Sequence, residues 1–109
     1  MTVYVVQNQE KIVNGEKVPK NNITPAAAFG ELVELAPPAP SMNRIPPFIL
    51  QKIDRALFVF NPEEDFLLPV GDPLLIATAT AFLGRRFDSF RILKWNRKTA
   101  SYSSHIVTI

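Results

Sequence analysis

The sequence predicts an α/β domain in which two main helices pack on a mixed β-sheet, as a sandwich of two or three layers, with an antiparallel hairpin at the C-terminal end. Three observations predict it. One segment repeats apolar residues every three or four positions and a second is apolar nearly all round, short runs of β-branched and aromatic residues lie around them, and proline, glycine and asparagine stand at the breaks. The length of 109 residues fits a single domain over residues 1–109.

The first elements are strands. Val3–Val6 is predicted as a strand because β-branched and aromatic residues dominate it. Asn14-Gly15 joins two short polar runs and supplies the positive φ angles of a type I′ turn. We therefore expect a hairpin over residues 11–18, ended by Pro19, that forms an edge or a projection.

A helical turn and a further strand follow. Residues 24–30 are interpreted as one helical turn that Thr24 caps and Gly30 closes in a left-handed conformation. Residues 31–35 fit a strand and, almost equally well, a helix. The proline-rich segment 37–41 is interpreted as a loop.

The first full helix is predicted over residues 46–60, and Asn61-Pro62 ends it. The apolar run 66–70 is typical of a strand covered on both faces, although Pro69 implies a strand end or a position without a ladder donor. The face of the first helix that points to the core consists of Ile49, Ile53, Ala56, Leu57 and Phe60.

The second helix is predicted from Pro73 to about Arg86, with Asp72 as its N-cap. It is apolar nearly all round, so we expect the fold or another subunit to bury it on more than one side. The run 66–95 is then a strand–helix–strand unit with parallel strands. Strands at 90–95 and 101–109 form the final hairpin, in which Trp95 faces Tyr102.

Composition narrows the classes of function. The chain has no Cys and one His, which excludes disulfides, thiolate metal sites, cysteine nucleophiles and a multi-histidine site within one chain. We therefore expect no cofactor and no metal, and a binding protein is favoured over an enzyme. The N-terminal residues lack the pattern of a signal peptide, and no apolar run approaches the ~20 residues of a membrane span. These features predict a cytoplasmic protein without a membrane partner.

Two regions are candidates for ligand binding. Gly71 and Asp72 follow a strand and begin a helix, the place where open α/β sheets bind ligands, although an Asp N-cap already satisfies the free helix amides. Lys94, Trp95 and Arg97 combine cations with an aromatic ring on one hairpin, as nucleic-acid binders do. Buried sheet residues and a solvated basic face are the structural alternatives. The C-terminal quarter is locally basic through Arg85, Arg86, Arg91, Lys94, Arg97 and Lys98.

Two further clusters are interpreted as structural. His105 lies beside Ser103 and Ser104, but a Ser–His pair without an orienting group and an oxyanion donor is not a catalytic site. The acidic run 63–65 lacks the alternating spacing of a calcium loop, so we expect a solvated turn.

Three sequence blocks carry a resemblance to a known group. Residues 28–33, residues 65–73 with the run LLPVGDP, and residues 93–97 followed by Tyr102 resemble a group of small proteins encoded by bacteriophages and prophages. Asn96 stands where that group more usually has Asp. The resemblance covers most of the chain beyond residue 22. It implies a phage origin and the cytoplasm of a host cell, and it brings no activity and no cofactor.

The leading hypothesis from the sequence is a phage-type protein that acts by binding, through protein–protein interaction or self-association over helix 73–86, without catalysis. A host or phage protein is a further possible partner. The alternative hypothesis is a nucleotide- or nucleic-acid-binding protein that uses Gly71, Asp72 and the basic, aromatic hairpin.

Overall fold

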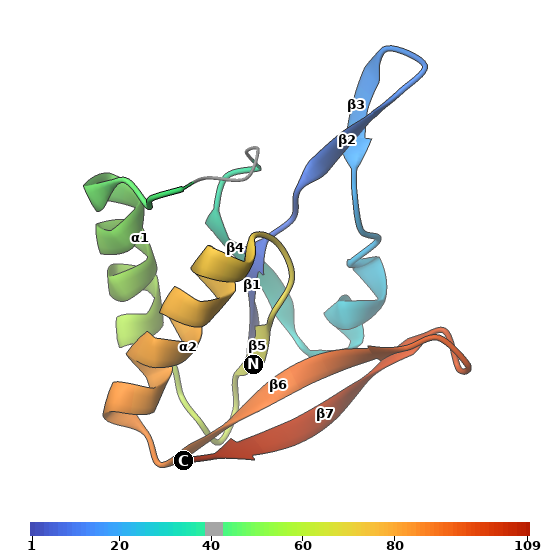
Figure 1. Ribbon diagram of the computed structural model, residues 1–109. Coiled ribbons are helices and arrows are strands. Elements are labelled where there is room, and N and C mark those ends of the chain that lie inside the picture. The colour runs from blue at the N-terminus through green and yellow to red at the C-terminus, as the bar shows by residue number, and fades with distance from the viewer. Residues whose placement is uncertain (39–42) are drawn as a thin grey trace.

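A computed structural model describes residues 1–38 and 43–109. Its centre is a five-stranded mixed sheet with the strand order β4-β1-β5-β6-β7 (Figure 1). β1 is parallel to β4 and β5, β5 is parallel to β6, and β6 is antiparallel to β7. The strands are β1 (Thr2–Gln7), β4 (Glu31–Ala36), β5 (Phe66–Leu68), β6 (Ser89–Asn96) and β7 (Ser101–Thr108). The mixed sheet and its C-terminal hairpin are as the sequence predicts.

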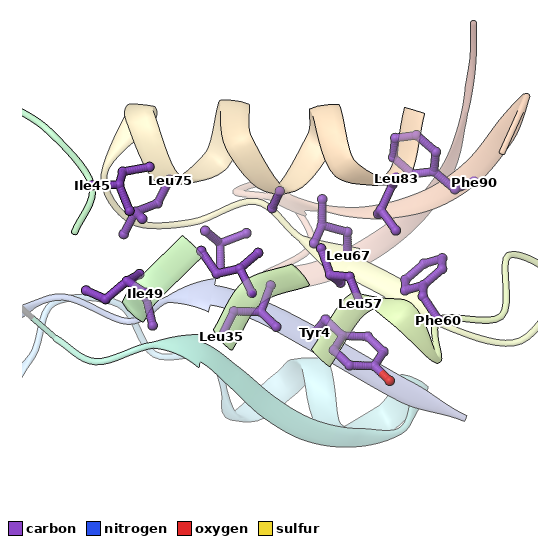
Figure 2. Packing of buried hydrophobic residues seen from close by; sticks show 14 residues of the cluster. Tyr4, Leu35, Ile45, Ile49, Leu57, Phe60, Leu67, Leu75, Leu83 and Phe90 are labelled. Carbon is purple, nitrogen blue, oxygen red and sulfur yellow. The ribbon is translucent and has the colours of Figure 1, made fainter. Parts of the chain in front are cut away.

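Both main helices, α1 (Pro47–Phe58) and α2 (Pro73–Arg86), cover one face of this sheet. Side chains alternate between the two faces of a strand. Tyr4 and Val6 of β1 accordingly pack with the helices, and Figure 2 shows that cluster between α2 and the sheet. Val3 and Val5 point to the other face, which the short 3₁₀ helix η1 (Thr24–Phe29) covers through Ala26. The molecule therefore has three layers.

The winding of the chain reverses at the centre of the sheet. The chain leaves β1, forms β4 on one side of it, and returns over α1 to form β5 on the other side. The carboxyl ends of β1 and β5 thus make a topological switch point, where α/β sheets bind ligands. The strand–helix–strand unit β5–α2–β6 has parallel strands, as predicted.

A second sheet consists only of β2 (Glu10–Val13) and β3 (Glu16–Pro19). Its turn residues Asn14 and Gly15 have φ angles of 52° and 81°, so the predicted type I′ turn is confirmed. Figure 1 shows this ribbon projecting from the body of the molecule. Its side chains are almost all exposed.

The strand alternative at residues 31–35 is confirmed and extends to Ala36, and β5 ends at Leu68, directly before Pro69, as that proline implied. Two expectations about the short helix η1 change. Thr24 does not cap η1, because Ile23 occupies the cap position and the Asn22 side chain accepts the Thr24 N–H. Gly30 has a φ of 154° with an extended ψ, which is not the predicted left-handed helical closure. Of the predicted proline-rich loop, residues 39–41 lie outside the described residues.

The fold of one chain buries only one side of the second helix, so burial of its other side by another subunit stays a prediction. Only one stripe of α2 is fully buried, formed by Leu75, Ala79 and Leu83, because α1 and the sheet meet it from the same side. Leu74, Ala77 and Ala81 are exposed. Among the described residues, the helices are too short or too polar to cross a membrane.

Candidate functional site

The switch point is occupied by a buried glutamine. Gln7, the last residue of β1, is fully buried. Its main-chain N–H donates to the carbonyl of Val70 (3.1 Å), its Oε1 accepts the Asp72 N–H (2.9 Å), and its Nε2 donates to the carbonyl of Pro37 (3.0 Å). One side chain therefore connects the end of β1, the start of α2 and the segment after β4.

Gly71 lies against this glutamine. Its φ of +112° favours glycine, and a Cβ built on it would lie 2.6 Å from both Cβ and O of Gln7. The space that the missing side chain of Gly71 leaves is thus filled by Gln7 of the same chain. Asp72 Oδ1 accepts the N–H of Leu74 (2.8 Å), which confirms the predicted N-cap of α2.

Lys94, Trp95 and Arg97 lie together at the far end of the β6–β7 hairpin. They line one surface hollow with Asn96, Lys98, Ser103 and His105. Gly71 and Asp72 are not among its lining residues. Figure 1 shows the β6–β7 turn projecting away from the loop between β5 and α2, so the structure separates the two predicted halves of the ligand site.

Strand register and turn geometry shape this hollow. Trp95 pairs with Tyr102, and their rings meet edge to face with centroids 4.9 Å apart, as the sequence predicts. The Asn96 side chain accepts the Lys98 N–H (2.9 Å) and tightens the turn. Tyr102 is buried, which raises the pKa of its phenol, whereas Trp95 stays 40% exposed. The indole therefore contacts one buried ring and remains partly accessible.

The charge of the hollow is uniformly positive. Residues 89–109 contain no Asp or Glu. Within the described part of the chain, the side chains of Lys94, Arg97 and Lys98 form no ion pair or hydrogen bond. A hairpin with unpaired cations around an exposed aromatic ring can attract phosphates and stack a base.

The other cations of the basic C-terminal quarter serve the fold. Arg86 lies 5.0 Å from the ring centres of Phe58 and Phe87 and donates to the carbonyl of Leu57 (2.7 Å). Arg85 lies over the Phe82 ring, and Arg91 lies 4.2 Å from the centre of the Phe66 ring. The predicted basic stretch therefore divides into a packed half and a free half.

Ser103 and His105 belong to the hollow, which the sequence did not predict. Ser103 Oγ lies 2.8 Å from His105 Nε2, because residues two apart share a face of β7. In the described part of the chain no carboxylate contacts this imidazole. The hairpin register could have predicted this neighbourhood. A turn that pairs Asn96 with Ser101 places Ser103 opposite Lys94.

The acidic run 63–65 contains a structural carboxylate. Asp65 is buried and accepts the main-chain N–H groups of Thr2 (2.9 Å) and Asn61 (2.8 Å). Among the described residues, no cluster of His, Asp and Glu has the arrangement of a metal site.

Comparison with known proteins gives one family. The chain matches, over residues 1–109, the family described as Phage Pam3 gp32-like protein. No curated protein and no solved structure matches it.

Proposed function

The chain belongs to the Phage Pam3 gp32-like protein family, and from this premise we propose that it is a phage protein that acts by binding single-stranded nucleic acid at the β6–β7 hairpin. Lys94, Arg97 and Lys98 contact phosphates, and Trp95 stacks on a base. We thus favour nucleic-acid binding, the alternative hypothesis from the sequence, over self-association.

The observation that carries it is that none of the described residues lining the hollow is acidic. Ammonium and guanidinium groups that have no partner in the protein lose no ion pair when they take up a phosphate. Each phosphate contact releases a condensed counterion, which drives binding at low salt.

Single strands suit the hollow better than duplexes because the aromatic ring is accessible. A base in a single strand can leave its neighbours and stack on the partly exposed ring of Trp95, a contact that contributes about 1–3 kcal/mol in other proteins. The edge-to-face contact with Tyr102 limits the positions of the indole, which reduces the side-chain freedom lost on binding.

Trp95 is the only tryptophan, so its fluorescence reports on this site alone. Titration with oligo(dT) at low salt is expected to quench it. The triple variant Lys94→Ala/Arg97→Ala/Lys98→Ala should bind about a hundredfold more weakly in about 0.1 M salt, because three released counterions are lost.

The projecting β2–β3 ribbon and the loop after it supply a matched control. Lys11→Ala/Lys17→Ala/Lys20→Ala removes the same charge from another exposed segment that carries lysines around a hollow. This control should keep the affinity. Absence of quenching, or equal weakening by both triple variants, would contradict a site at the β6–β7 hairpin.

A second candidate function is self-association through the outer face of α2. Leu74, Ala77 and Ala81 are exposed there. The hydroxyls of Thr78 and Thr80 donate to the carbonyls of Leu74 and Ile76 (2.8 Å each), so these side chains direct their donors into the helix itself. The result is a helix face with few free polar groups, which a second copy of the chain could cover.

A further inference from the structure

The most open element of the sheet is its edge strand β7. It lies at the end of the strand order and pairs only with β6 among the described strands. Its eight residues pair in unbroken register from Ser101 to Thr108, without a bulge. Figure 1 shows β7 along the outer border of the molecule.

The ladder defines which main-chain groups face outward. The Ile109 N–H donates to the carbonyl of Asp88 (2.9 Å), and this pair continues the register in which Thr108 lies opposite Ser89. Hydrogen-bonded pairs alternate along an antiparallel ladder. The odd-numbered residues of β7 therefore bond to β6, and the N–H and C=O groups of Tyr102, Ser104, Ile106 and Thr108 turn away from it.

Edge strands usually carry features that prevent pairing with another chain. The opposite edge of this sheet has them, because β4 exposes Glu31 and Glu34. β7 contains no Asp, Glu, Lys, Arg, Pro or Gly, and its Ile106 is 70% exposed. The β4 edge is thus protected against pairing with another chain, whereas the β7 edge is not.

We infer that β7 pairs antiparallel with β7 of a second copy of this chain, so that the two sheets join into one. A strand that pairs with itself around a two-fold axis places identical residue types near one another, and charged side chains would repel there. β7 has none of those charges, whereas β4 would set glutamates against glutamates. Charge therefore selects a second copy at β7 and disfavours it at β4.

This interface is separate from the outer face of α2. It uses the main-chain edge of β7, whereas the hollow at the hairpin turn is lined by the side chains of Ser103 and His105 from the same strand. Antiparallel pairing directs the two β6–β7 turns toward opposite ends of the joined edge. Each copy thus keeps its own basic hollow, and the inference stands whether or not nucleic acid binds there.

The test is the mass of the full chain by light scattering, at micromolar concentrations and upward. The wild type is expected to be a dimer, and Ile106→Lys, which places a charge on the edge, is expected to halve its mass. Phe48→Lys is the matched control, because this α1 side chain is 68% exposed and gains the same charge away from the sheet edge. Circular dichroism establishes that both variants fold.

Hydrogen exchange locates the interface independently of any substitution. The amides of Ser104, Ile106 and Thr108 should exchange slowly at high protein concentration and quickly at low concentration, while the amide of Ile109, bonded to Asp88, changes little. A wild type that stays monomeric would overturn the inference. So would a dimer that Ile106→Lys leaves intact, or one that Phe48→Lys dissociates equally.

Discussion

Gly71 shows how a single residue changes the interpretation of a site. A glycine at the end of a strand predicts close approach of a ligand to the backbone, and the structure fills that space with Gln7. The amide of Gln7 in turn binds the Asp72 N–H that a ligand would need. The polar groups at this strand end therefore hold the fold together.

Gly71→Ala is expected to destabilise the protein by about 3 kcal/mol, because it combines a strained positive φ with a clash against Gln7. Gly15→Ala is the matched control, since its φ is also positive and a Cβ there would meet nothing within 4 Å. That change should cost only about 1 kcal/mol. Chemical denaturation measures both values, and equal losses would show that Gln7 does not fill the site as described.

The free energy of unfolding is expected to fall at alkaline pH because of Tyr4. Burial, and secondarily the charge of Asp65, raises the pKa of its phenol in the folded state. Above about pH 10 the unfolded chain loses this proton while the folded chain keeps it, so the free energy of unfolding falls as pH rises.

Tyr4→Phe should make that fall shallower, because it removes one of the two phenols whose pKa is raised by folding. The measurement is the free energy of unfolding from denaturant titrations between about pH 8 and 11. An unchanged pH dependence would refute the role of Tyr4.

At the scale of elements, α2 has two different sides. Its inner stripe packs in the core, and its outer face carries Leu74, Ala77 and Ala81, internally bonded threonines and, in the last turn, the exposed Arg85. We propose that a second copy of the chain buries that face, which is the interaction that the sequence suggested first.

Ala81→Glu tests this face of α2. The charge should lower the mass of any assembly that buries the outer face, as measured by light scattering, because an unpaired carboxylate resists desolvation. Gln51→Glu on the exposed side of α1 makes an equal change of charge and should leave the mass unchanged. If both variants keep the mass of the wild type, α2 forms no interface.

Elements whose limits depend on local signals were predictable. The Asn14-Gly15 turn and the Asp72 cap of α2 act through their own dihedral angles and neighbouring amides. Covering α2 on one side only was not predictable, because that depends on where α1 packs. Which cations of the basic segment pack on the fold was also not predictable. Arg86 and Arg91 lie over the rings of Phe58 and Phe66, which come from earlier elements of the chain.

For the molecule as a whole, the sheet topology sets the place of the candidate site. Open α/β sheets bind ligands at the carboxyl ends of their strands, and in this chain the Gln7 side chain fills that position between β1 and β5. The antiparallel pair β6–β7 extends beyond the parallel part of the sheet and carries its free cations with it. The sequence predicts Lys94, Trp95 and Arg97 as ligand-binding residues together with Gly71 and Asp72, because nothing local indicates how far the hairpin projects.

The central claim is that the free cations of this hairpin bind phosphates. The most direct test is the affinity of the wild-type protein for oligo(dT) as a function of salt concentration, followed by Trp95 fluorescence. The plot of log affinity against log salt is expected to have a slope of about −2, which corresponds to roughly 0.7 for each of Lys94, Arg97 and Lys98. A slope near zero, or an equal slope in Lys94→Ala/Arg97→Ala/Lys98→Ala, would contradict it.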